Sequence, residues 1–194
     1  RRADILCEGP RIVAIARDIR ADGSEVLDAA GLTVGPGFID VDVHGGGGSS
    51  FFTQDADRVR AYSRWAPRNG VTSFLVSTVG RDDMETLHTL RALAPAIGEA
   101  GGAEALGFHL EGPFINPLRR GAFPPEYLRA PAREEFARYQ DAAAGCIRQG
   151  TCAPERPRAL ELAVAIAASG AIVAMGHTDA TTVKARAGFD SGIS

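Results

Sequence analysis

The sequence predicts an α/β protein whose larger part is an incomplete barrel of parallel strands. From residue 38 onward, short apolar strands alternate with helical segments, a pattern that favours a parallel sheet with right-handed crossovers. Three of the apolar strands run directly into Asp, Glu or His, as barrel strands do when they deliver side chains to the mouth of an active site. About five β/α units fit into the chain, fewer than a closed barrel of eight requires.

The composition is that of a soluble globular protein of 194 residues, long enough for a domain with a buried core. A net charge of −3 gives no reason to expect nucleic acid or an anionic membrane as a partner. Three cysteines without CxxC spacing favour a reducing, cytoplasmic compartment. The most apolar stretch, residues 159–175, is interrupted by Glu161 and Ser169-Gly170, so we expect no membrane span.

Residues 1–35 are predicted to form the N-terminal part of a small β module. Residues 4–15 are typical of a hairpin with its turn at Gly9-Pro10, and 24–28 and 32–34 of further short strands. Gly35-Pro36-Gly37 marks the junction to the second predicted domain, residues 36–194. No signal peptide is recognised, and both ends of the chain suggest a piece of a longer protein.

The second domain is predicted to begin with a strand over 38–43, whose nearly continuous apolar run indicates burial on both faces. The remaining strands are expected at 71–77, 105–110, 146–152 and 171–175, and the helices at 55–68, 82–100, 132–144, 156–169 and 181–189. An incomplete barrel exposes unpaired backbone groups at its last strand. Three alternatives follow: further strands exist, another chain supplies them, or the sheet does not close.

Polar residues at three strand ends predict a metal site. Asp42 and His44 end the first strand before four glycines, Glu111 follows the third, and His177 follows the fifth. One carboxylate and neutral imidazoles suit Zn²⁺, which lowers the pKa of bound water to roughly 7 and polarises a carbonyl. The alternative for each residue taken alone is that it caps its own strand.

Several motifs together resemble N-acetylglucosamine-6-phosphate deacetylases, a family of the amidohydrolase superfamily. They are residues 36–45, 109–113 and 176–180, with Asn116 and the run 119–122 specific to the deacetylase branch. The resemblance implies a TIM-like (β/α)8 metal-dependent hydrolase barrel flanked by a β-sandwich built from both termini. It also implies hydrolysis of N-acetylglucosamine-6-phosphate to glucosamine-6-phosphate and acetate, a step of amino-sugar catabolism.

The resemblance places Glu111 and His177 at two metal-ligand positions of the family. It places the third ligand, a His, and the catalytic Asp beyond Ser194, so the chain alone is not expected to be a competent enzyme. Many amidohydrolases have His-x-His at the first strand end, where this chain has Asp42 and His44. Asp42 and His44 are candidate ligands of a second ion, so one zinc ion is expected and a second is left open.

The resemblance also assigns residues around the substrate. Ala122 would contribute through its backbone, and Phe123 replaces a His that contacts the substrate near the reacting carbonyl. Arg119 and Arg120 are candidates for a phosphate contact, since guanidinium groups suit phosphate. Because the family takes an active-site Arg from a neighbouring subunit, a homodimer is implied. Asp40 and Asp179 are candidates for orienting the histidines.

Two other functions stay open. Phe123 can neither donate a hydrogen bond nor carry charge, which suggests a related amidohydrolase with a different amide substrate. The missing third ligand and acid suggest a non-catalytic remnant that binds metal or a sugar phosphate. We interpret His109 as structural and His88 as a solvated residue on a polar helix face.

Overall fold

A computed structural model of the chain describes residues 3–9, 11–78, 81–99 and 101–194. The chain divides into two compact units, Arg1–Pro36 and Gly37–Ser194. Among the described residues, every helix is too short or too polar to cross a bilayer.

The first unit contains the strands of the predicted hairpin, in which β1 (Asp4–Glu8) pairs antiparallel with β2 (Arg11–Ala16). Pro10 of the predicted turn lies outside the described residues. The strands predicted at 24–28 and 32–34 are wrong, because these residues have no regular structure. Leu27 is 91% exposed. Alternating apolar residues become a strand only where a neighbouring strand accepts their backbone hydrogen bonds, and this segment has no such neighbour within the described unit.

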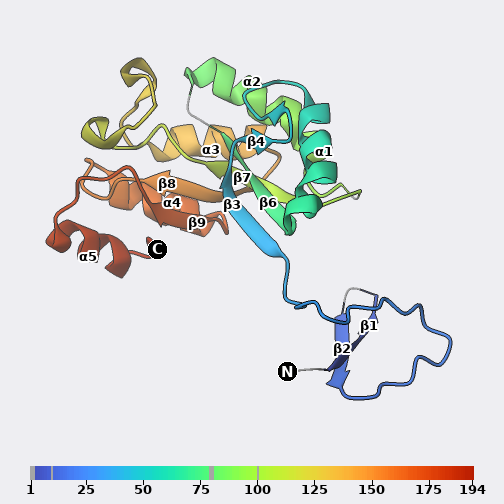
Figure 1. Cartoon of the computed structure of the whole chain (residues 1–194). Coiled ribbons are helices and arrows are strands. Elements are labelled where there is room, and N and C mark those ends of the chain that lie inside the picture. The colour runs from blue at the N-terminus through green and yellow to red at the C-terminus, as the bar shows by residue number, and fades with distance from the viewer. Residues whose placement is uncertain (1–2, 10, 79–80, 100) are drawn as a thin grey trace. The chain divides into compact units, whose positions relative to one another are not determined.

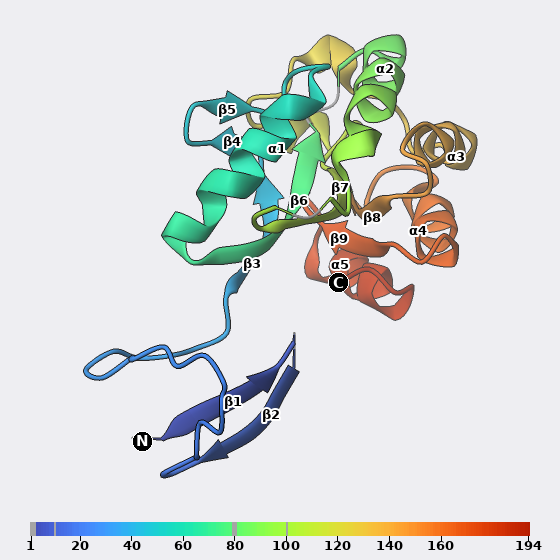
Figure 2. The same cartoon turned by 90° about the vertical axis from the view of Figure 1, so that its right-hand side faces the viewer.

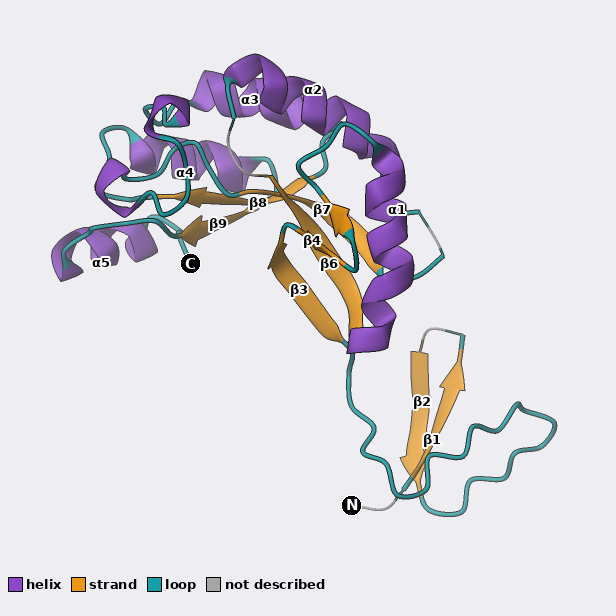
Figure 3. Cartoon of the chain, turned by 45° about the horizontal axis from the view of Figure 1, so that its top comes forward, coloured by secondary structure: helices purple, strands orange, loops and turns teal. Residues whose placement is uncertain are grey.

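The second unit is built on a parallel sheet of five strands in the order β3-β6-β7-β8-β9 (Figure 1). Each strand therefore lies beside the next one in the sequence, as in part of a barrel. The bounds of these strands are Phe38–Val43, Val71–Thr78, Glu104–Leu110, Ile147–Cys152 and Ile172–Met175. The sheet curls, as Figure 3 shows from above.

In the described ranges, four α-helices connect consecutive strands and follow the curve of the sheet along one side, and a fifth comes after the last strand (Figure 3). They are α1 (Ala56–Trp65), α2 (Asp83–Leu93), α3 (Arg133–Ala142), α4 (Ala159–Ala168) and α5 (Thr182–Asp190). Three begin at residues whose side chains accept a hydrogen bond from the first turn: Asp55, Asp82 and Thr181. The predicted helices 55–68 and 82–100 end in short 3₁₀ segments, Ala66–Asn69 and Ala94–Ala96.

The hydrophobic core lies between the sheet and the helices. Phe74 of β6 and Phe108 of β7 are completely buried, and Leu90, Leu162 and Ile166 of α2 and α4 pack into the same core. Burying such a side chain contributes about 1.5–3 kcal/mol of transfer free energy. The core therefore holds the middle of the sheet rigid and leaves the strand ends free to carry polar groups.

Strand β3 departs from the prediction, because it is not buried on both faces. Phe38 is 70% and Ile39 is 62% exposed. The physical reason is its place in the sheet: β3 is an edge strand that pairs only with β6 in the described structure. An apolar run indicates a strand of a parallel sheet, but it does not reveal whether a neighbour covers both sides.

The four glycines after β3 form a small hairpin, β4 (Gly45–Gly46) with β5 (Ser49–Ser50), which packs beside α1 (Figure 2). Gly47 has φ +58°, and a Cβ there would lie 2.5 Å from Cγ of the Trp65 indole. Glycine is required because the backbone comes this close to the indole. The hairpin thus fixes the chain that leaves His44.

Candidate metal centre

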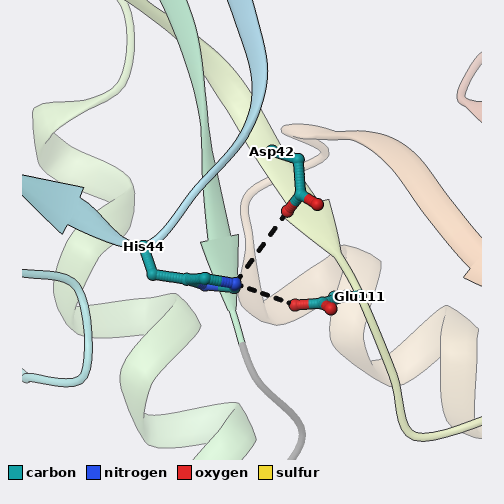
Figure 4. Close-up of side chains that lie close together, drawn as sticks. All are labelled: Asp42, His44 and Glu111. Carbon is teal, nitrogen blue, oxygen red and sulfur yellow. Dashed lines mark ion pairs between the residues drawn. The ribbon is translucent and has the colours of Figure 1, made fainter. Parts of the chain in front are cut away.

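The parallel register brings the carboxyl ends of the strands to one edge of the sheet. Leu110, the last residue of β7, lies opposite Thr78 of β6 and Gly150 of β8. The last residues of the strands and the residues directly after them therefore meet at this edge. They include three of the residues predicted as metal ligands at the ends of β3 and β7, namely Asp42, His44 and Glu111 (Figure 4).

Glu111 is the central residue of the site, and its side chain is only 12% exposed. Its Oε2 lies 3.0 Å from His44 Nε2, and its Oε1 lies 2.9 Å from His177 Nε2. One carboxylate therefore joins imidazoles from two different strand ends. The four predicted ligand residues converge here, since Asp42 Oδ1 lies 3.9 Å from His44 Nε2.

Both imidazoles are oriented by backbone carbonyls. The Nδ1 atom of His44 lies 3.2 Å from the Ser77 carbonyl oxygen, and that of His177 lies 2.8 Å from the Arg119 carbonyl oxygen. A carbonyl only accepts, so each Nδ1 carries the proton and donates it. In the neutral imidazole, Nε2 then carries a lone pair, and both lone pairs face the Glu111 carboxylate.

Two lone pairs facing a carboxylate are favourable only when a cation or added protons lie between them. Glu111 Oε2 is also buried without a hydrogen bond in the described part of the chain, although His44 Nε2 is 3.0 Å away. Asp42, His44 and Glu111 offer three ligand atoms within 4.8 Å of one another. The donor set of nitrogen and oxygen atoms fits Zn²⁺.

His109 lies beneath this site and links three strands. It is buried, its Nε2 lies 2.8 Å from Thr151 Oγ1, and its Nδ1 lies 3.0 Å from Ser77 Oγ. The same Nδ1 is 3.3 Å from Asp42 Oδ1. Burial lowers the pKa of His109, and the neighbouring carboxylates of Asp42 and Glu111 only partly offset this effect. These contacts agree with a structural interpretation of His109.

The predicted substrate residues lie on the loop after Glu111. Phe123 is 3% exposed, and its ring meets the His177 ring edge to face with centroids 5.4 Å apart. A Cβ at Gly112 would lie 2.7 Å from the Phe123 ring, so the glycine allows this packing. Phe123 thus forms an apolar wall beside His177, whereas Ala122 is exposed.

Both candidate phosphate ligands, Arg119 and Arg120, already bind groups within the protein. The guanidinium of Arg119 pairs with Asp179 at 2.5 Å. Arg120 Nη1 donates to the Phe123 carbonyl oxygen at 2.7 Å. Asp40 accepts a hydrogen bond from the backbone N–H of Asp42 at 3.3 Å, so it supports the strand end instead of a histidine.

Sequence reasoning missed Glu155, which follows β8 at the same edge of the sheet. Its carboxylate binds the loop that carries His177 through Thr178 and Asp179. Burial raises the pKa of Glu155, but hydrogen bonds from Thr178 and Asn116 outweigh burial and lower the pKa below its usual value. A carboxylate after a parallel strand is the same signal that identified Glu111, and it was available in Ala153-Pro154-Glu155.

Comparisons with curated proteins point to one family, although no protein-family model matches the chain. N-acetylglucosamine-6-phosphate deacetylase of Lysinibacillus sphaericus is 32% identical over 182 residues, which cover 92% of this chain and 46% of the relative. That of Bacillus subtilis is 36% identical over 160 residues, or 80% of this chain and 40% of the relative. N-acetylgalactosamine-6-phosphate deacetylase of Escherichia coli O157:H7 is 33% identical over 159 residues, or 81% and 42%.

Solved structures give the same result. A complex of the Mycobacterium smegmatis deacetylase with N-acetyl-D-glucosamine-6-phosphate superimposes with a TM-score of 0.84 at 33% identity, covering 95% of this chain and 47% of that one. The Pasteurella multocida deacetylase superimposes with a TM-score of 0.87 at 26% identity, covering 99% and 50%. The chain spans about half the length of the relatives it matches. The motifs, the fold and these matches agree that the chain is a relative of the N-acetylglucosamine-6-phosphate deacetylases.

Proposed function

We propose that this chain carries the metal-binding part of a zinc-dependent hydrolase that removes the N-acetyl group from N-acetylglucosamine-6-phosphate. The observation that carries the proposal is the Glu111 carboxylate, which lies between two imidazoles whose Nδ1 atoms both donate to backbone carbonyls. This arrangement leaves nitrogen and oxygen lone pairs directed at one another, and a divalent cation satisfies them.

In this proposal Glu111 and His177 hold the zinc ion, and Asp42 and His44 are the candidates for a second ion. When bound, zinc supplies an activated water molecule and polarises the amide carbonyl. The carbonyls of Ser77 and Arg119 fix the tautomer in which Nε2 is the ligand atom and hold both rings in the orientation that this task needs.

The substrate contacts are proposed on the loop after Glu111. Ala122 is an exposed residue whose backbone would hydrogen-bond to the substrate, and the Phe123 ring would exclude water beside His177. Arg120 requires release from the Phe123 carbonyl before it can meet a phosphate. The family resemblance assigns a third ligand and the proton-transferring Asp to positions after Ser194. We therefore expect the 194-residue chain alone to release no acetate.

We further propose a cytoplasmic homodimer. Three cysteines outside any CxxC pattern suit a reducing compartment. The dimer rests on the family resemblance alone. Gel filtration with light scattering tests it, and a monomeric mass for the complete protein would contradict it.

A related amidohydrolase with a different amide substrate is the second candidate, and Phe123 favours it. The phenyl ring occupies a position where a His would be able to hydrogen-bond to a carbonyl. The variant Phe123→His separates the two functions. In a true deacetylase it should preserve or raise activity on N-acetylglucosamine-6-phosphate, whereas in an enzyme for another amide that activity should stay low.

The test is acetate release by the full-length protein that the gene encodes, loaded with zinc, and not by the 194-residue chain alone. We expect the wild type to release acetate from N-acetylglucosamine-6-phosphate and less acetate from N-acetylgalactosamine-6-phosphate. The Glu111→Gln variant should release none from either sugar phosphate. Zinc-loaded protein that binds the metal but releases no acetate from either sugar phosphate would overturn the deacetylase proposal. Equal activity of Glu111→Gln would overturn the assignment of the metal ligand.

A further inference from the structure

We infer that Glu155 is a positioning residue that fixes His177 for metal binding by clamping two loops together. The inference rests on the proposed function, because it concerns the metal-binding geometry of His177. Glu155 follows β8 and precedes α4, and it does not contact either His177 or Glu111 through a hydrogen bond in the described structure.

The carboxylate of Glu155 accepts hydrogen bonds from three residues of two loops. Its Oε1 accepts from Asn116 Nδ2 at 2.6 Å and from the Asp179 backbone N–H at 2.7 Å. Its Oε2 accepts from the Thr178 hydroxyl at 2.5 Å. Asn116 belongs to the loop after β7, whereas Thr178 and Asp179 belong to the loop after β9. One side chain from the segment after β8 thus ties together the loops that follow the strands on both sides of β8.

The two loops also bind each other directly around His177. The Asn116 backbone N–H donates to the His177 carbonyl oxygen at 3.0 Å. His177 Nδ1 donates to the Arg119 carbonyl oxygen at 2.8 Å, and the Arg119 guanidinium pairs with Asp179. The position of the His177 ring therefore depends on how closely the loops approach each other, and Glu155 sets that approach.

His177 needs such support because its backbone is in the left-handed region, with φ +49°. A residue other than glycine adopts this conformation only when surrounding contacts hold it. The contacts of Thr178 and Asp179 with Glu155 come directly after His177 in the chain. Loss of the carboxylate should let the segment relax and turn Nε2 away from Glu111.

Three substitutions separate the geometry of the acceptor from its charge. Glu155→Ala removes all three hydrogen bonds, and Glu155→Asp keeps the charge but withdraws the carboxylate by about 1.5 Å, the length of one carbon–carbon bond. Glu155→Gln loses the charge but keeps an oxygen for Asn116 and Asp179, while its amide donates to the Thr178 hydroxyl. We expect Glu155→Gln to keep most of the wild-type loop contacts and zinc affinity, and Glu155→Ala and Glu155→Asp to lose them.

Glu161→Ala is the matched control. Glu161 lies on α4, its side chain is 62% exposed, and its partner in the described structure is Arg158 at 3.2 Å. The substitution Glu161→Ala removes a carboxylate of the same kind, six residues from Glu155, without changing a contact of the loops after β7 and β9. Thermal melting of every variant confirms that it folds.

The first measurement is hydrogen exchange of the 194-residue chain without metal, read on peptides that contain the Asn116 and Asp179 amides. The second is the zinc dissociation constant of the protein produced from its own gene, measured by competition with a chromogenic chelator. In Glu155→Ala and Glu155→Asp we expect faster exchange at both amides, unchanged exchange in α2, and zinc affinity lowered about 10- to 100-fold. Glu155→Gln and Glu161→Ala should resemble the wild type.

Unchanged exchange at the two amides in Glu155→Ala would overturn the inference, as would faster exchange with unchanged zinc affinity. A defect in Glu155→Gln as large as that of Glu155→Ala would also overturn it, because charge and not acceptor geometry would then be responsible. Failure of the wild type to bind zinc would overturn the proposed function instead. In that case the exchange measurement alone decides whether Glu155 clamps the loops.

Discussion

The substitution Tyr139→Phe tests how the end of the long loop after Glu111 is held on the helices. Tyr139 of α3 is completely buried, and its hydroxyl lies 2.6 Å from Glu135 and 2.9 Å from Asp83 of α2. It also accepts a hydrogen bond from Arg129, at the end of the long loop after Glu111. Burial, followed by the hydrogen bond to Glu135, raises the pKa of Tyr139, so the group is a neutral donor at all ordinary pH values.

The expected cost follows from what remains after the hydroxyl is removed. Asp83 keeps two hydrogen bonds from Arg138, at 2.8 and 3.0 Å, and Glu135 keeps its pair with Arg129. No charge is left without a partner, so the loss lies near the lower end of the range for hydrogen bonds to charged groups, about 1.5 kcal/mol. For a chain of this length that lowers Tm by about 3–6 °C.

Thermal unfolding followed by circular dichroism measures this shift, with Tyr127→Phe as the matched control. The Tyr127 hydroxyl makes no hydrogen bond in the described ranges, so its removal should change stability by less than about 0.5 kcal/mol. If Tyr139→Phe melts within about 1 °C of both the wild type and Tyr127→Phe, the network does not stabilise the fold. The attachment of the loop would then have to come from other contacts.

Three further predictions concern single side chains. Glu111→Gln should raise the zinc dissociation constant by about 10- to 150-fold, which corresponds to the loss of at least one charge-assisted interaction of about 1.5–3 kcal/mol. Isothermal titration calorimetry measures this change, and an unchanged affinity would exclude Glu111 as a ligand. Burial raises the pKa of Cys152 to about 12, so N-ethylmaleimide at about pH 8 should label the exposed Cys7 and the half-buried Cys146 but leave Cys152 unmodified. A third adduct in the mass spectrum of the native chain would contradict this prediction. The folded-state pKa of Glu155 lies below the usual 4.5, so its stabilising contribution is present at neutral pH and is lost as the pH falls through the folded value. The free energy of unfolding in urea should therefore fall more between about pH 5 and 3 in the wild type than in Glu155→Gln, and the same fall in both proteins would refute this prediction.

The strand-end residues explain why much of the site could be predicted from the sequence. Glu111 and His177 are each preceded by an apolar run, and parallel strands must place their carboxyl ends together. The alternation of strands and helices determined the order of the sheet in the same way, because consecutive β/α units place each strand beside the previous one.

Other features depend on contacts that no local pattern encodes. The exposed faces of Phe38 and Ile39 follow from the edge position of β3, which is a property of the whole sheet. The irregular chain around Leu27 has apolar residues like a strand but no described partner for its backbone. The role of Glu155 arises from donors 39, 23 and 24 residues away in the sequence.

The orientation of the two imidazoles also could not be predicted from the sequence. His44 and His177 donate to carbonyls on other strands or loops, at Ser77 and Arg119, and only the folded backbone brings these groups together. The tautomers that leave the Nε2 atoms free to bind a cation are therefore a consequence of the fold and not of the motifs.

The most direct test of the central claim is to locate the metal by anomalous diffraction at the zinc edge, in crystals of the protein grown with zinc. The account predicts a peak about 2.0–2.2 Å from a carboxylate oxygen of Glu111 and about 2.0–2.1 Å from His177 Nε2. A second peak beside Asp42 and His44 would show that two ions bind. Zinc located only at other residues, with the Glu111 carboxylate bonded to protonated imidazoles, would contradict the account.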